Sequence, residues 1–311
     1  MDAQRYFYGP VPSRRLGYSL GVDVIPKKLC PFDCVYCQTG RTTEKTIERV
    51  SFVNTDRLKK ELIGILAGKA TIDVITFSGS GEPTLHQNLD RIIAVIREVC
   101  GRRIPVCVIT NSSLLFLPEV RRELAAADIV IPSLDAPNEA LLRKINRPCA
   151  QVNFERIVEG LVKFRAEFEG RFWLEIMIVK GINDSPEAAA EWKGLIQRIR
   201  PDKVQLNIPV RPSQEHAAVP DQETLRMIQE VIGEETEVVL PFEKQPAARR
   251  DERIEEEIVE YLRRRPATLA DLCASTGAEE ETVRRVLEEL VSSGRACGQK
   301  HQGVEYFRIN D

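Results

Sequence analysis

Short apolar segments alternate with amphipathic segments along residues 18–242, and this alternation limits the possible folds more than any other feature of the sequence. The apolar segments are rich in Val and Ile and almost uninterrupted, which is typical of strands that helices cover in a parallel sheet. They span residues 18–26, 73–79, 105–113, 128–135, 172–179 and 203–210. The amphipathic segments predict helices at residues 55–68, 87–100, 153–168, 185–200 and 221–233.

Repeated strand–helix units predict an α/β fold with a parallel sheet, which either stays open or closes into a barrel. About six units are visible, whereas a complete barrel of this kind has eight. We therefore expect a partial TIM-like barrel. In such barrels the side chains at the carboxyl ends of the strands build the ligand site.

The pattern changes after residues 241–250. Residues 252–266 predict a helix, residues 268–277 and 278–294 predict two helices joined by a short turn, and residues 295–300 and 303–310 predict two strands. A helix, a helix-turn-helix and a hairpin in this order are typical of a winged helix-turn-helix domain. The sequence thus predicts two domains, residues 1–245 and residues 246–311.

Composition and charge bear on the partners and the cellular location that we expect for the chain. The formal net charge is −3, so no bulk positive charge indicates a nucleic-acid-binding protein. The N-terminal residues lack an apolar signal-peptide core, and no run of about 18 uncharged apolar residues predicts a membrane span. We expect a cytoplasmic protein with no membrane contact, and cytosolic thiols stay reduced.

Three cysteines lie close together in a loop that follows the first predicted strand. Cys30, Cys34 and Cys37 have the spacing C-x3-C-x2-C. Reduced thiols argue against a disulfide, and a structural zinc site needs four ligands, whereas the nearest further candidate is His86. A [4Fe–4S] cluster generally takes four cysteines, so three would leave one iron open to an outside ligand. From spacing alone, a cluster and a set of buried thiols at a turn both remain open.

A second motif, FSGSGEPTL, follows the second predicted strand at residues 77–85. Gly79 and Gly81 allow a close approach of the backbone to a ligand, and Glu82 offers an acceptor for an ammonium group. Taken alone, the same residues also suit a simple turn.

Together, these two motifs resemble the signature of the radical S-adenosylmethionine (SAM) enzymes, in which Tyr36 would occupy an aromatic position of the cysteine motif. The resemblance implies a partial (β/α)6 barrel, with Cys30, Cys34 and Cys37 as ligands of three irons of a [4Fe–4S] cluster. SAM would chelate the fourth iron. An electron would cleave it to methionine and a 5′-deoxyadenosyl radical that abstracts hydrogen from the substrate, with a flavodoxin- or ferredoxin-like protein as electron donor.

Residues at the ends of the predicted strands are the expected cofactor contacts, either by the resemblance or by their position. They are Tyr36, Ser80, Gly81, Glu82, Pro83, Asn111, Ser133, Asp135, Asn207 and Arg211. Several of these polar residues would serve equally well as helix caps or turn formers. Glu175 lies within an apolar strand and needs a partner, whether it lines the barrel or contacts substrate. Arg14 and Arg15 suit a clamp for SAM or a substrate anion, or a surface ion pair.

The segment of residues 8–23 and several short motifs look similar to a group related to the wybutosine-pathway tRNA-modifying enzymes. Those enzymes use a second cluster held by upstream cysteines, and no cysteine precedes Cys30 here. The remaining cysteines show no paired ligand spacing, so we expect them to be core or surface residues. They are Cys100, Cys107, Cys149, Cys273 and Cys297.

The charge of the C-terminal region bears on its partner. Residues 251–311 hold nine Lys or Arg and fourteen Asp or Glu, a net charge of −5, and binding to duplex DNA depends on cations that meet phosphates. We therefore expect DNA binding to be absent and a protein, peptide or dimer contact to be favoured. Four residues of the predicted hairpin keep a nucleic-acid contact open: Arg295, Lys300, His301 and Arg308. Three hypotheses follow: an enzyme acting on a macromolecule (tRNA, peptide or protein), an enzyme acting on a small molecule with this domain for oligomerisation, or a cluster-bearing regulator.

Overall fold

A single eight-stranded sheet forms the centre of the computed structural model, which describes residues 5–68, 71–213, 215–233, 236–239 and 254–310. Its strand order is β1-β2-β5-β6-β7-β8-β9-β10, and every neighbouring pair after β1–β2 is parallel. The strands are β1 (Phe7–Ser13), β2 (Gly17–Val22), β5 (Val74–Phe77), β6 (Val106–Thr110), β7 (Ile129–Pro132), β8 (Arg171–Met177), β9 (Lys203–Asn207) and β10 (Thr236–Val238). All six predicted strands are confirmed, and the parallel α/β sheet agrees with a partial TIM-like barrel.

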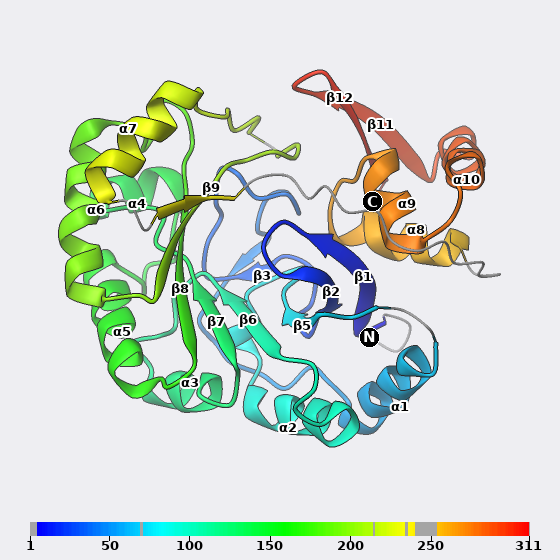
Figure 1. The fold of residues 1–311 in the computed structure, drawn as a ribbon, viewed down its shortest axis with the longest axis horizontal. Coiled ribbons are helices and arrows are strands. Elements are labelled where there is room, and N and C mark those ends of the chain that lie inside the picture. The colour runs from blue at the N-terminus through cyan, green and yellow to red at the C-terminus, as the bar shows by residue number, and fades with distance from the viewer. Residues whose placement is uncertain (1–4, 69–70, 214, 234–235, 240–253, 311) are drawn as a thin grey trace.

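Seven helices among the described residues cover the outer face of this curved sheet (Figure 1). They are α1 (Thr55–Leu66), α2 (Leu89–Cys100), α3 (Pro118–Leu124), α4 (Glu139–Ile145), α5 (Phe154–Glu167), α6 (Pro186–Ile199) and α7 (Gln222–Ile232). Most begin at a side chain that accepts a bond from a free backbone N–H, as Asn153 does at α5 and Ser185 at α6. The apolar stripe of α2, with Ile92, Ile93 and Ile96, is buried in the main core, as its periodicity predicts.

The sequence analysis missed four elements of the barrel, each for a physical reason. β1 contains Pro10 and Pro12, and prolines argue against a strand. Both are tolerated here because β1 is an edge strand with an irregular register between Tyr8 and Val11. β10 has only three residues, and α3 and α4 have seven each, too few for a clear apolar period.

The C-terminal segment, residues 254–310, follows with α8 (Ile254–Arg264), α9 (Leu269–Thr276), α10 (Glu280–Ser292), β11 (Ala296–His301) and β12 (Val304–Ile309). Three helices and a hairpin are the elements that the sequence predicts here. The predicted domain boundary at residues 245 and 246 lies outside the described residues. Within the described ranges, no helix combines the length and apolar character that a bilayer crossing requires.

The C-terminal segment packs against both sides of the barrel's open seam. β1 and β10 are the two edges of the sheet and do not pair with each other in the described part of the chain. Tyr8 and Val11 of β1 belong to the apolar core of the segment, which lies beside β1 in Figure 1. On the other side, the hydroxyl of Tyr306 donates to the carbonyl of Val210, just after β9, at 2.9 Å. The segment therefore forms a wall across the opening between the first and last strands.

Candidate active site

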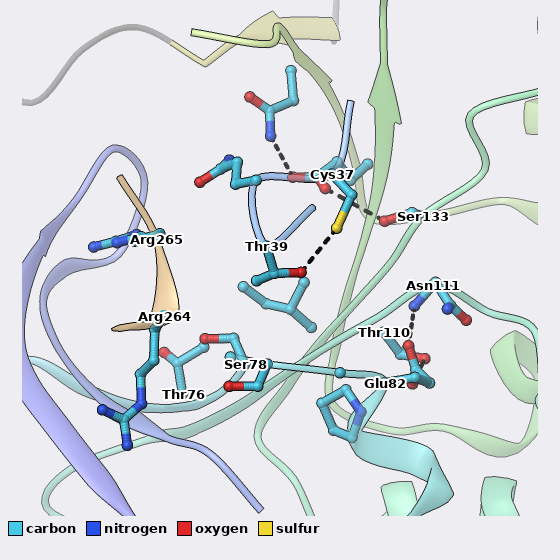
Figure 2. A pocket seen from close by; sticks show the side chains of 18 of the residues that line it. Cys37, Thr39, Thr76, Ser78, Glu82, Thr110, Asn111, Ser133, Arg264 and Arg265 are labelled. Atoms are coloured by element: carbon cyan, nitrogen blue, oxygen red, sulfur yellow. Dashed lines mark hydrogen bonds between the residues drawn. The ribbon is translucent and has the colours of Figure 1, made fainter. Parts of the chain in front are cut away.

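A cavity of about 370 Å³ lies at the carboxyl ends of the parallel strands, where the fold is expected to build its site. All three clustered cysteines line it, together with nine of the ten residues expected to contact the cofactor. Figure 2 shows Cys37, which shares a hydrogen bond of 3.0 Å with Thr39, and, below it to the right, Asn111 above Glu82. We call this space the inner cavity.

The cysteine loop, residues 28–40, is docked on the segment that follows α4. The backbone N–H of Asp33 donates to the carbonyl of Asn146 at 2.9 Å, and the N–H of Cys149 donates to the carbonyl of Pro31 at 2.8 Å. Cys30 lies in a short strand, β3 (Leu29–Cys30), which pairs with β4 (Glu44–Lys45). The loop is thus fixed by backbone bonds on both sides and not by its cysteines.

Two of the three sulfurs receive a side-chain amide. Asn111 donates through Nδ2 to Sγ of Cys30, and Asn146 donates through Nδ2 to Sγ of Cys34, each at 3.3 Å. Burial raises the pKa of both thiols well above the usual value, and the carboxylate of Asp135 raises that of Cys34 further. A buried thiolate here requires a cationic partner, and a metal centre is one.

The three cysteine sulfurs of the inner cavity are a donor set that an iron–sulfur cluster can use. Among the described residues, no group of three His, Cys, Asp or Glu side chains converges on one metal position. A structural zinc ion requires such convergence of four ligands, whereas an iron–sulfur cube takes each cysteine at a separate iron and fills the space between them. Three sulfurs that line one cavity suit the cube.

The glycines of the Gly-Glu-Pro segment, residues 77–85, are required by the protein's own packing. A Cβ at Gly81 would lie 2.2 Å from the carbonyl oxygen of Leu29, and a Cβ at Gly79 would lie 2.4 Å from Cγ of Asp23. We expected these glycines to allow a close approach to a ligand. In the structure they allow the cysteine loop and a buried carboxylate to approach the segment.

Replacing Gly81 with Ala should displace β3 and with it Cys30. We expect the free energy of unfolding to fall by about 1–3 kcal/mol, as for other overpacked sites, and the iron content after reconstitution to fall. Gly64 is the matched control, because a Cβ there meets no atom within 4 Å, and Ala in a helix is favoured by about 0.5–1 kcal/mol. Urea unfolding and iron analysis of both variants check this; an unchanged Gly81→Ala protein would contradict it.

Glu82 is buried and already bound by four donors from its neighbours. Its Oε1 accepts from the N–H of Thr84 at 3.1 Å, the hydroxyl of Thr84 at 2.7 Å and the hydroxyl of Thr110 at 2.6 Å, and its Oε2 accepts from the N–H of Asn111 at 2.8 Å. Burial nevertheless raises the pKa of Glu82. Oε2, with a single donor, keeps acceptor capacity for a cationic ligand group.

Asp135 lies behind the inner cavity and is the one expected contact that does not line it. It accepts from the hydroxyl of Tyr36, from Nδ2 of Asn146 at 2.8 Å and from the N–H of Met177 at 2.9 Å. Burial raises its pKa to about 6 in spite of these donors. In this structure Asp135 fixes Tyr36 and the cysteine loop.

An ion pair between Arg15 and Glu175 forms the far wall of the inner cavity. Glu175 also accepts from Nδ2 of Asn207 at 3.1 Å, and the hydroxyl of Ser133 lies 3.4 Å from its Oε1. Burial raises the pKa of Glu175, but the charges of Arg15 and Arg14 and the bonds from Arg15 and Asn207 together outweigh it, so the pKa lies below the usual value. The predicted need of Glu175 for a partner is confirmed, and the partner is inside the barrel and not on the surface.

Three residues at the site were not expected from the sequence. Asp23, just after β2, is buried and accepts from the hydroxyl of Ser80 at 2.6 Å and from Nε of Arg264 at 3.2 Å. A carboxylate directly after an apolar strand was a usable signal for Asp23. Arg264 and Arg265 enter the inner cavity from the C-terminal segment, on the side away from Asn111 (Figure 2). No local pattern links residues 241 positions apart.

Comparisons with known proteins agree with this architecture. The chain is 38% identical over 307 residues to a protein of Brachyspira hyodysenteriae named GTPase Obg, covering 97% of this chain and 45% of that protein, so it spans less than half of that relative. It is 39% identical over 234 residues to a UPF0026 protein of Methanocaldococcus jannaschii, covering 73% and 72% of the two chains. A dual-specificity RNA methyltransferase of Oleidesulfovibrio alaskensis is 27% identical over 206 residues, covering 63% and 56%.

Among solved structures, a radical SAM methyltransferase from Sphaerobacter thermophilus superposes with a TM-score of 0.55 and 21% identity, over 71% of this chain and 65% of that one. At this identity the likeness concerns the fold. The model of the radical SAM superfamily matches residues 24–192, more than half of the chain, and includes both the cysteine loop and the Gly-Glu-Pro segment. The chain therefore belongs to the radical SAM superfamily, in the group of UPF0026 proteins.

Proposed function

We propose that Cys30, Cys34 and Cys37 hold a [4Fe–4S] cluster and that SAM binds beside it in the inner cavity. Enzymes of this superfamily use that cluster and SAM as cofactors. The observation that carries the proposal is that the three sulfurs line one cavity together with the Gly-Glu-Pro segment.

The cofactors would supply the reactive species: one electron breaks SAM into methionine and a 5′-deoxyadenosyl radical, which takes a hydrogen atom from the substrate. The residues of the chain would position these cofactors and tune the reduction potential of the cluster. The amides of Asn111 and Asn146 donate to two of the sulfurs, and such bonds stabilise negative charge on sulfur and set the reduction potential. Asp135 would hold Tyr36 in place.

The walls of the inner cavity would bind SAM and the substrate. Oε2 of Glu82 has room for the ammonium group of SAM, next to the backbone of Ser80, Gly81 and Pro83. Ser133, Asn207 and Arg211 line the opposite side, where we assign contacts to SAM or to the substrate.

We further propose that residues 246–311 are a winged helix-turn-helix domain attached to a radical SAM domain of residues 1–245, and that the substrate is a macromolecule. A small metabolite needs no second module, and this module supplies Arg264 and Arg265 to the cavity wall. The sequence similarity to an RNA methyltransferase supports RNA over a peptide. A flavodoxin- or ferredoxin-like protein would deliver the electron.

The test is anaerobic reconstitution with iron and sulfide, followed by SAM and dithionite. We expect about four irons per chain and release of 5′-deoxyadenosine. Iron and sulfide analysis and chromatography of the products measure both. A reconstituted protein that binds no iron, or that leaves SAM intact, would contradict the proposal.

A further inference from the structure

Three arginines that line the inner cavity each have one buried nitrogen without a hydrogen-bond partner among the described residues. These atoms are Nη1 of Arg14, Nε of Arg211 and Nε of Arg265. They come from the β1–β2 turn, from the segment after β9, and from the end of α8. Buried donors are normally paired, so three unpaired ones in residues of one cavity wall are unusual, and after small side-chain shifts a ligand with several acceptor oxygens could pair them.

The same arginines repel one another. Burial and the charges of Arg211, Arg15 and Arg265 lower the pKa of Arg14 to about 10, against a smaller opposing effect of Glu175. Arg211 lies 3.6 Å from Asp271, and Arg265 donates to the hydroxyl of Tyr261 at 2.8 Å. An anion between the arginines would relieve this repulsion.

A second cavity, of about 530 Å³, continues from the inner cavity to the outside. The two share Lys28, Gln38, Thr39, Arg264 and Arg265. One wall of the second cavity is the loop after the cysteines, and the other is the C-terminal segment. Seven of its lining residues are Lys or Arg and none is Asp or Glu: Lys27, Lys28, Arg41, Arg263, Arg264, Arg265 and Arg308. We call it the cationic cleft.

Three of these cations form ion pairs with carboxylates that do not line the cleft. Arg41 pairs with Asp33 at 3.3 Å, and Arg263 pairs with Glu260 at 2.6 Å. Arg264 pairs with Asp23 at 3.2 Å and with Glu260 at 2.8 Å.

Two further cations of the cleft have neutral partners, since Arg308 donates to the sulfur of Cys297 at 3.3 Å and Arg265 to Tyr261. The residues that line the cleft thus include Lys and Arg but no Asp or Glu, although residues 251–311 carry a net charge of −5.

We propose that the cationic cleft and the three inner arginines bind the phosphates of a single-stranded polynucleotide and present one of its nucleotides to the inner cavity. The proposal rests on the proposed function, whose substrate class it names. A small phosphorylated compound would need only the inner arginines, whereas cations along two connected cavities match a chain of phosphates. A base must be unpaired to reach an enclosed site, which favours a single strand.

The test compares two triple variants of the reconstituted protein. Arg41→Gln, Arg263→Gln and Arg308→Gln remove charge from the exposed part of the cleft. Arg143→Gln, Arg284→Gln and Arg285→Gln remove the same charge from exposed ion pairs that line neither cavity. Fluorescence anisotropy measures the affinity for labelled single-stranded RNA and for labelled single-stranded DNA of the same sequence. The affinity for labelled polyglutamate, an anion without phosphates, is measured in the same way for comparison.

We expect the cleft triple to weaken oligonucleotide binding at least about tenfold and to make the slope of log K against log salt shallower by about 2, from three lost phosphate contacts. The control triple should change affinity less than about twofold. Arg265→Gln should also weaken binding, since it removes an inner donor. Comparison of the affinities for RNA and for DNA shows whether the protein prefers ribose or deoxyribose. Tighter binding of either strand than of polyglutamate supports the proposal.

Equal losses in the two triples, or polyglutamate bound as tightly as the strands, would overturn it. Oligonucleotide binding by Arg265→Gln as tight as that of the unaltered protein would overturn the role of the inner arginines. Release of 5′-deoxyadenosine by the unaltered protein without oligonucleotide tests the proposed function separately, so failure of one is distinguishable from failure of the other.

Discussion

Replacing Cys34 with Ala should leave the protein folded but without its cluster, and release of 5′-deoxyadenosine from SAM should fall to background. Cys34 is one of only three cysteines on the inner cavity, so its loss leaves two protein ligands for four irons. Its thiol does little for the fold itself, because the loop is held by backbone bonds to the segment after α4. Iron and sulfide content, visible absorption and product release measure the loss.

Cys273→Ala is the matched control for this prediction. Cys273 is a free, partly exposed cysteine on α9 and does not line either cavity. We expect it to keep the iron content and the activity of the unaltered protein. A Cys34→Ala protein with a complete, active cluster would remove the cysteine loop from the proposed site.

Replacing Arg264 with Met should cost about 3–5 kcal/mol of unfolding free energy, the usual effect of breaking a buried charge pair. The side chains of Arg264 and Asp23 are 3% and 2% exposed, and Arg264 also binds Glu260 and the carbonyl of Arg5 at 2.7 Å. Met keeps the stem of the side chain but leaves the buried carboxylate of Asp23 without its cation, whereas Glu260 keeps its pair with Arg263. Urea unfolding with a second signal from limited proteolysis checks the effect.

The control for Arg264 is Arg284→Met, because Arg284 is exposed on α10 and its ion pair with Glu280 lies in solvent. Exposed pairs of this kind contribute about 0–1 kcal/mol, so stability should hardly change. Adding Asp23→Asn to Arg264→Met should recover part of the loss by removing one unpaired charge. A loss below about 1 kcal/mol in Arg264→Met would show that the segment is not held by this pair.

The barrel could be predicted because its strands are read locally. Val- and Ile-rich runs such as residues 73–79 and 105–113 are buried on both faces and carry their pattern within a few residues. β1 could not be predicted, since its prolines are typical of a loop and its position at the edge is known only from the assembled sheet. The cysteines and the Gly-Glu-Pro segment were recognisable because each is contiguous in the sequence.

The rest of the site depends on contacts between distant segments. The pairing of Asp23 with Arg264 and that of Arg15 with Glu175 each join residues more than a hundred positions apart. The net charge of a region does not say where its charges lie in the fold. A sum over residues 251–311 averages the glutamates at the start of α10 with arginines that the fold turns toward the barrel, so the acidic total hides a cleft wall lined by arginines. The expectation that this region avoids nucleic acid rested on that sum.

The wall that the C-terminal segment forms across the open seam has a mechanical consequence. Arg264 reaches Asp23, and Asp23 in turn accepts both the N–H of Ser80, at 3.1 Å, and its hydroxyl. A ligand that wedges the cleft open would pull on Arg264 and so on the loop proposed to hold SAM. The C-terminal segment and this loop are thus joined through two side chains, so a shift of either should displace the other.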